Sequence, residues 1–181
     1  MKGVVFTEFT EMVEDKFSPE ILEKIIDQAN LPSEGIYTSV GTYDHDEIIA
    51  LVQALSNETN ISIPDLIKTF GNHLFGQFEV GYPQFFEGVD SAITFLSKID
   101  NYIHVEVRKL YPDAELPKFE YEVVEDDQLI MEYRSIRPFA DLAEGLIQGC
   151  IEHFGGGLVL KREDIGEKNG TNARFTINRI E

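Results

Sequence analysis

Apolar residues recur at intervals of three and four along most of the first 115 positions, which is the spacing of one face of a helix. The first such stripe, over residues 4–14, consists of Val5, Phe6, Phe9 and Val13. Further stripes predict a helix after Ser18, a helix over 45–56, and a helix that begins after Ser62 and ends near Gly81. The N-terminal part of the chain is therefore expected to be helical and amphipathic.

Capping residues mark the starts of these helices. Ser18 precedes a proline and is expected to be an N-cap. Asp44 stands three residues before Glu47, and Ser62 stands three residues before Asp65. This is the spacing of a capping box, in which each side chain bonds to the backbone N–H of the other residue.

The longest helix is expected over residues 89–111, because neither Gly nor Pro interrupts this stretch before Pro112. Its apolar stripe consists of Ile93, Leu96, Ile99, Ile103, Val107 and Leu110. His104 falls at the edge of that stripe, so its imidazole can face inward. Asp100 and Arg108 lie four residues on either side of it, so a surface row of charged residues is the competing interpretation.

Beyond Pro117 the hydrophobic period changes to two, which predicts strands. Apolar residues alternate with polar ones on both sides of Glu125, Asp126 and Asp127, so a β-hairpin is expected. A helix over 138–153 follows, and two further strands are expected near 158–162 and 173–179. The fold class is thus α+β: a helical part (about 1–115), then a four-stranded antiparallel sheet with a helix between its two hairpins (about 116–181), in one domain.

The charge of the chain narrows the classes of partner. Fifteen Lys and Arg stand against 33 Asp and Glu, which gives a formal net charge of −18. A phosphate backbone or an anionic membrane would repel such a surface, so neither nucleic acid nor membrane is expected as a partner. One cysteine, Cys150, and the absence of a signal peptide or membrane span indicate a cytoplasmic protein.

Several motifs of enzyme active sites are missing from the sequence. It contains no GxSxG, no HExxH and no glycine-rich phosphate loop. Carboxylates are so numerous that a pair suited to acid–base catalysis is expected by chance. A hydrolase that uses such a pair stays open as an alternative, although the composition favours a solvated acidic surface.

Tyr133, Ser135 and Arg137 share one side of an extended segment, because side chains in a strand alternate between its faces. A phenol, a hydroxyl and a guanidinium in this arrangement suit a carboxylate ligand, which Arg can bind bidentately. An edge strand with an exposed Arg and a core Tyr is the alternative interpretation of the same three residues.

With these features together, the chain resembles the H-NOX (haem nitric oxide/oxygen binding) family, whose sensor domain is related to that of soluble guanylate cyclase. The matching segments are MKG at the N-terminus, FG at 70–71, LP at 116–117, YRSIR at 133–137 and EGLIQG at 144–149, together with His104 upstream of the YxSxR signature. The resemblance implies a haem b held between the helical and sheet-bearing parts. His104 would be the proximal iron ligand, Tyr133, Ser135 and Arg137 would hold the propionates, and Pro117 would press on the porphyrin.

The resemblance also implies which residues line the other face of the haem. In oxygen-binding members a tyrosine in the helix after YxSxR donates a hydrogen bond to dioxygen, and this position is Leu142 here. Phe9 and Leu74 take the supporting positions, and Val5 is also expected in this distal pocket. Without a donor, oxygen is expected to be excluded while nitric oxide and CO bind.

As a mechanism, nitric oxide is expected to weaken the iron–histidine bond and let the porphyrin relax against Pro117. The chain would then act as a sensor without enzymatic activity that signals to a separate histidine kinase or cyclic-di-GMP enzyme. A haem-free module of the same fold, in which Arg137 binds another carboxylate, is the alternative.

Overall fold

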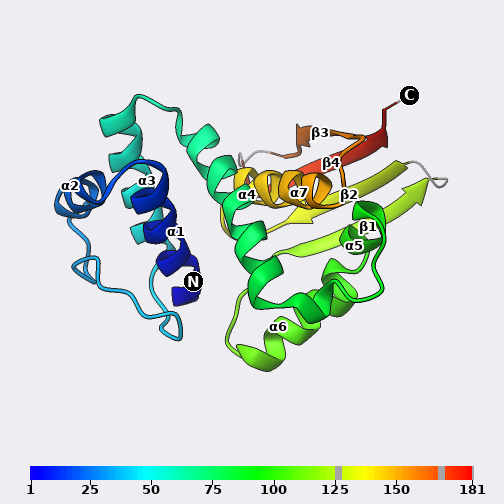
Figure 1. Cartoon of the computed structure of the whole chain (residues 1–181), viewed down its shortest axis with the longest axis horizontal. Coiled ribbons are helices and arrows are strands. Elements are labelled where there is room, and N and C mark those ends of the chain that lie inside the picture. The colour runs from blue at the N-terminus through cyan, green and yellow to red at the C-terminus, as the bar shows by residue number, and fades with distance from the viewer. Residues whose placement is uncertain (125–127, 167–169, 181) are drawn as a thin grey trace. The chain divides into compact units, whose positions relative to one another are not determined.

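The computed structural model describes residues 1–124, 128–166 and 170–180. The chain forms two compact units, Met1–Phe70 and Gly71–Glu181. The boundary lies inside helix α4 (Ile63–Gly81), so the second unit contains helices as well as the sheet (Figure 1). No helix among the described residues is long and apolar enough to cross a membrane.

The first unit consists of α1 (Gly3–Lys16), α2 (Pro19–Ala29), α3 (His45–Thr59) and the start of α4. The helices predicted from the spacing of apolar residues are confirmed, although α3 continues to Thr59 where the pattern predicts an end at 56. Fully buried side chains of the predicted stripes include Phe6, Phe9, Leu51 and Leu55, and Met12, outside the predicted stripe of α1, is fully buried as well. The unit is therefore held by the apolar faces of its helices.

Ser18 caps α2 as predicted, and its hydroxyl accepts a hydrogen bond from the Ile21 N–H at 3.3 Å. The capping box predicted at Asp44 is wrong in its second half. Asp44 accepts from the Asp46 N–H at 3.1 Å, but the carboxylate of Glu47 points elsewhere. It accepts hydrogen bonds from the backbone and hydroxyl of Ser33 and from the Tyr37 hydroxyl. Glu47 thus anchors the loop between α2 and α3. Polar groups of the loop that are removed from water need a hydrogen-bond partner, and the Glu47 carboxylate supplies it.

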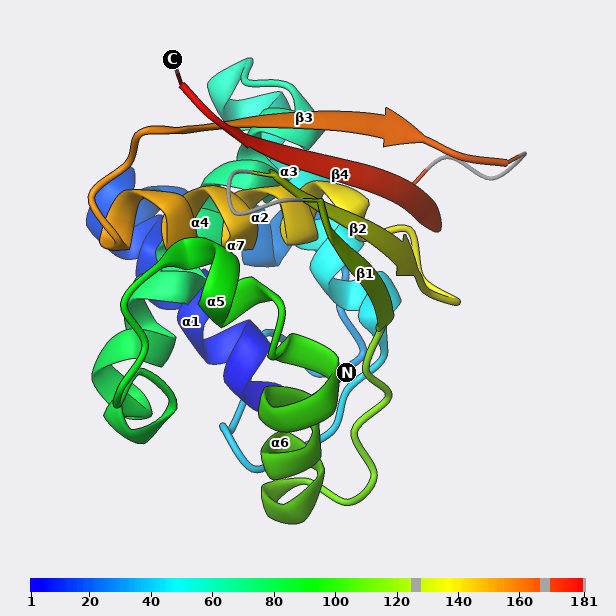
Figure 2. The same ribbon diagram turned by 90° about the vertical axis from the view of Figure 1, so that its right-hand side faces the viewer.

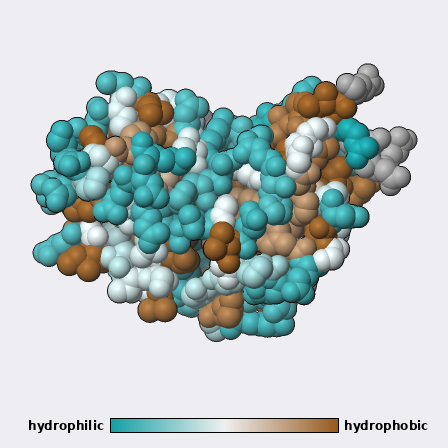
Figure 3. Space-filling view, in the orientation of Figure 1, coloured by the Kyte–Doolittle hydropathy of each residue, from teal (hydrophilic) through white to brown (hydrophobic). Residues whose placement is uncertain are grey.

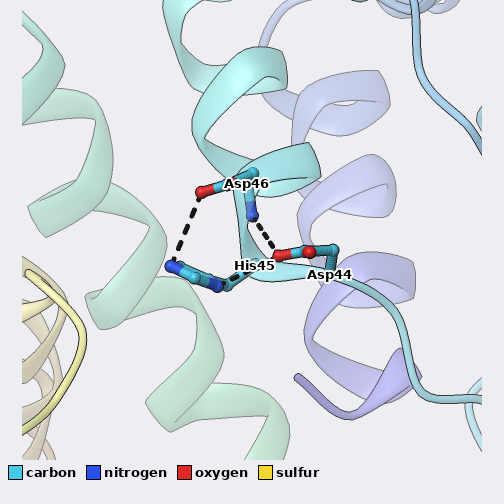
Figure 4. Close-up of side chains that lie close together, drawn as sticks. All are labelled: Asp44, His45 and Asp46. Atoms are coloured by element: carbon cyan, nitrogen blue, oxygen red, sulfur yellow. Dashed lines mark hydrogen bonds and ion pairs between the residues drawn. The ribbon is translucent and has the colours of Figure 1, made fainter.

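Asp44, His45 and Asp46 gather at the start of α3 (Figure 4). The His45 ring lies 3.1 Å from the Asp44 carboxylate and 3.5 Å from that of Asp46. One ligand atom from each residue fits within 4.8 Å, as metal ligands would. A cation there would face the positive end of the helix dipole, so we interpret the group as a helix cap.

The second unit contains the predicted sheet. Its elements after α4 are the 3-10 turn η1 (Pro83–Phe85), α5 (Ala92–Leu96), the π-helical turn η2 (Ile99–Ile103), α6 (His104–Leu110), β1 (Lys118–Val124), β2 (Gln128–Arg134), α7 (Ala140–His153), β3 (Leu158–Asp164) and β4 (Asn172–Arg179). The strands are antiparallel in the order β1-β2-β4-β3, and α7 lies against one face of the sheet (Figure 2). The α+β fold with a helix between two hairpins is confirmed. The turn predicted at Glu125, Asp126 and Asp127 lies outside the described residues.

The inner face of the sheet is buried in the middle and open at one edge. Leu129, Met131 and Phe175 are fully buried, as the alternation in β2 and β4 predicts. Tyr121 and Val123 in the edge strand β1 share that face but are 41% and 47% exposed. On the face seen in Figure 3, hydrophobic residues gather over the region of β1 and α5, while hydrophilic residues predominate over the first unit.

The continuous helix predicted over 89–111 is wrong, and the longest described helix is α4 with 19 residues. The Ser97 hydroxyl donates to the carbonyl of Thr94 at 2.9 Å, and the Lys98 N–H bonds to Phe95, three residues back. Such side-chain bonds compete with the helical ladder and bend helices. A π-helical turn follows, and it ends where α6 starts at His104.

We expect Glu47→Ala to lower the free energy of unfolding by about 1–3 kcal/mol, because it leaves the Ser33 and Tyr37 groups without their acceptor. Chemical denaturation measures the change. Glu14→Ala removes the same charge from an exposed position on α1 and should change stability by less than about 0.5 kcal/mol. Equal effects of the two substitutions would contradict the anchoring role.

Candidate functional site

His104 is buried, with 9% of its surface exposed, at the first residue of α6. Its backbone N–H bonds to the carbonyl of Ile99, five residues back, which is the spacing of a π turn. Burial lowers the pKa of the imidazole, and a hydrogen bond with Asp100 opposes that shift. The surface position considered from the sequence is therefore wrong. A buried neutral imidazole is the form that ligates metals.

Asp100 connects the histidine to the sheet. One oxygen of its carboxylate lies 3.4 Å from Nδ1 of His104 and 3.4 Å from the backbone N–H of Phe119, the second residue of β1. Because Nδ1 faces this acceptor, the remaining ring nitrogen, Nε2, is the atom that can bind a ligand. A carboxylate on the far nitrogen of a ligating histidine also fixes the orientation of the ring.

A row of aromatic rings joins His104 to the tyrosine of the YxSxR segment. The Phe119 ring centre lies 6.0 Å from that of His104 and 5.5 Å from that of Tyr133. Phe119 and Tyr133 are also direct partners in the register of β1 and β2. The sheet thus brings together the two candidate motifs, which are far apart in the sequence.

Strand β2 ends at Arg134, so the extended segment predicted through Arg137 is too long. The chain bends after Ser135, and the Ser135 hydroxyl accepts a hydrogen bond from the backbone N–H of Arg137 at 3.0 Å. Burial raises the pKa of the Tyr133 phenol, while its bonds with Ser135 and the backbone of Phe139 oppose the shift. Hydrogen bonding through Ser135 therefore keeps the three residues together where the strand period no longer does.

The guanidinium of Arg137 is largely buried and pairs with Glu115. Its side chain is 15% exposed, and its Nη2 donates to the Glu115 carboxylate. Its Nη1 lies 3.4 Å from the backbone carbonyl of Glu115. Arg137 is thus already a carboxylate-binding residue in this structure.

Pro117 and the predicted distal residues are distributed over both units. Pro117 is half-buried directly before β1, and Leu74 (2% exposed, α4) and Leu142 (half-buried, α7) belong to the second unit. In the first unit, Val5 is half-buried on α1 and Phe9 is fully buried there, with its ring 5.2 Å from that of Phe70. All four of these side chains are apolar.

Helices α4 and α7 approach closely beside these leucines. A Cβ atom added to Gly71 would lie 2.4 Å from the carbonyl oxygen of Leu142 and 2.9 Å from the Cα of Gly145. Leu74 follows on the next turn of α4. Glycine at 71 thus allows the backbones to come together at the level of Leu142.

Comparison with known proteins identifies the family. The model of the haem-NO-binding family, HNOB, matches residues 2–161, which is most of the chain. The chain belongs to this family. The H-NOX protein of K. algicida, in its unliganded Fe(II) state, is 45% identical with a TM-score of 0.93, and the match covers 100% of this chain and 97% of that one.

Two further H-NOX structures carry a gas ligand. That of Shewanella woodyi, in the Fe(II)CO state with IWP-051 bound, is 42% identical with a TM-score of 0.84, over 99% of this chain and 95% of that one. That of S. oneidensis in the Fe(II)NO state is 24% identical with a TM-score of 0.90, over 100% of both chains, and shows the fold alone. The H-NOX resemblance predicted from the sequence is confirmed.

The sequence motifs missed three residues of the candidate site. From the sequence, Asp100 enters only the competing interpretation of a surface row of charges, although its position four residues before the histidine is a signal for contact. Nothing in the pattern singled out Glu115 or Phe119, because their contacts depend on the loop before β1 and on strand pairing.

We expect Asp100→Ala to lower the free energy of unfolding by about 1–2 kcal/mol, because the N–H groups of His104 and Phe119 lose their shared acceptor. Urea denaturation of the haem-free chain tests this. Asp90→Ala removes an exposed carboxylate nearby in the sequence and is expected to be neutral. Equal stabilities of the two variants would show that Asp100 makes no net contribution.

Proposed function

We propose that this chain is a haem b gas sensor in which His104 is the proximal iron ligand. The observation that carries the proposal is the buried imidazole with Nδ1 toward Asp100 and Nε2 left for a metal. The H-NOX relatives support it, since their structures are described in Fe(II), Fe(II)CO and Fe(II)NO states.

The residues of the chain fit a haem with free propionates. Covalent c-type attachment needs a C-x-x-C-H motif, whereas the sequence has one cysteine, Cys150, which is buried. Arg137 supplies a charge-assisted donor for a propionate, and Ser135 and Tyr133 lie beside it. Haem b, held by His104 and by contacts to its carboxylates, agrees with both facts.

The apolar distal residues favour nitric oxide and CO over oxygen. Dioxygen at ferrous iron carries partial negative charge and needs a hydrogen-bond donor, whereas nitric oxide is nearly neutral. Leu142 and Leu74 cannot donate, and no tyrosine occurs in the sequence after Tyr133. Lack of one charge-assisted hydrogen bond of about 1.5–3 kcal/mol weakens oxygen binding roughly tenfold to a hundredfold.

When bound, the haem iron supplies the gas-binding centre, and the residues of the chain convert binding into a change of structure. Asp100 restrains both His104 and the start of β1. A movement of the imidazole is therefore transmitted to the sheet through the Asp100 carboxylate. The π turn before His104 is a local irregularity that can rearrange, and Pro117 lies before the same strand. The segment from the π turn to the start of β1 would then have two arrangements, and gas binding would favour one of them.

The output of such a sensor passes to another protein. We propose a histidine kinase or a cyclic-di-GMP enzyme as the partner, and no catalytic activity for the chain itself. The net charge of −18 favours a partner with a basic surface and disfavours nucleic acid.

We expect His104→Gly to abolish the Soret band of the purified protein, because the only proposed iron ligand from the chain is lost. Added imidazole should restore the band by occupying the space of the missing ring. His45→Gly, at the start of α3, is the matched control and should keep haem. Absorption spectra after reconstitution measure all three.

A chain that stays colourless after reconstitution with haem would contradict the proposal. It would favour a haem-free module in which Arg137 binds another carboxylate. Hydrolytic turnover that disappears with a carboxylate substitution would favour the hydrolase alternative.

We expect Leu142→Tyr to raise the oxygen affinity of the ferrous protein about tenfold to a hundredfold, because the phenol supplies the missing donor. Gas titrations followed by absorption spectroscopy measure the change, with Leu142→Phe as the control that adds the ring without the hydroxyl. Stable oxygen binding by the parent protein would show that Leu142 is not the position that decides the ligand.

A further inference from the structure

The carboxylate site at Arg137 contains a carboxylate of the chain itself. A guanidinium stays protonated, so its burial to 15% exposure requires a negatively charged or hydrogen-bonding partner. Among the residues that the structure describes, both hydrogen bonds from its Nη atoms go to Glu115, one to the carboxylate and one to the backbone carbonyl. Glu115 therefore occupies donors that a bound carboxylate needs.

The two members of this pair differ in how firmly they are held. The bend that carries Arg137 is fixed by the bond from its backbone N–H to Ser135, and the guanidinium is mostly covered. The side chain of Glu115 is 61% exposed, so its carboxylate can turn into water at little cost. When another carboxylate arrives, Glu115 is the member that leaves.

Arg162, in the same unit, is a buried arginine whose carboxylate partners cannot easily be replaced. Its guanidinium binds Asp141 at 2.5 Å, Glu144 at 3.1 Å and Asp164 at 2.7 Å. Asp141 and Glu144 are only 20% and 21% exposed and belong to α7, so they cannot withdraw into water. Arg137 has one counter-ion among the described residues, and because that carboxylate is exposed it can be exchanged for another.

We propose that Glu115 is an internal competitor for the Arg137 carboxylate site and thereby sets how tightly this chain retains its haem. The inference rests on the proposed function, because it takes a haem propionate as the competing carboxylate. Glu115 is a positioning residue that acts on the haem through Arg137.

The test compares haem loss from the parent holoprotein and from Glu115→Gln, with excess apomyoglobin as the acceptor. Glutamine keeps the size of the side chain but binds a guanidinium more weakly, so haem loss is expected to be about twofold to fivefold slower. The difference should shrink at high salt, where exposed ion pairs are screened. Glu122→Gln, which removes the same charge from an exposed position on β1, should leave the rate unchanged.

A double-mutant cycle separates competition at Arg137 from a general effect of charge. In an Arg137→Gln background, Glu115→Gln should no longer slow haem loss. Unchanged or faster loss from Glu115→Gln overturns the inference, and so does slowing that persists without Arg137. A parent protein that takes up no haem overturns the proposed function instead.

Discussion

The carboxylate of Asp100 joins the candidate histidine to the first strand of the sheet, and the orientation of the imidazole depends on that bridge. Removing an imidazole from water favours its neutral form, while the neighbouring carboxylate favours the charged one. Here burial is the larger effect on the pKa of His104, so Asp100 serves mainly to orient the ring. The result is an imidazole of fixed orientation beside an apolar cluster that includes Phe119 and Tyr133.

Excess negative charge determines which partners the buried arginines of the second unit have. With 33 acidic residues against 15 basic ones, nearly any buried guanidinium finds a carboxylate of the chain itself. Arg162 is surrounded by three such carboxylates, and its pKa is raised well above the usual value despite its burial. Among the described residues, Arg137 has one such carboxylate, on a mostly exposed side chain, so within that part of the chain only this arginine combines burial with a replaceable partner.

Contacts with residues near in sequence compete with contacts to distant residues elsewhere in the fold. Ser18 caps α2 as predicted because its partner lies three residues away, within reach of the sequence pattern. Glu47 has the right spacing for a capping box, yet Ser33 and Tyr37 reach its carboxylate from the preceding loop. Local spacing shows what a side chain can do, and a competing partner in the folded chain decides what it does.

The periods of apolar residues by themselves determined the strands, the α+β class and the helices other than the one predicted over 89–111, because each depends on contacts between residues near in sequence or on one repeating face. They also placed His104 close to an apolar stripe and Tyr133, Ser135 and Arg137 in one short segment. Only the tertiary structure decided that Asp100 and Phe119 join the site and that Glu115 pairs with Arg137. Those outcomes depend on hydrogen bonds and packing between segments brought together by folding, and no periodicity along the chain encodes them.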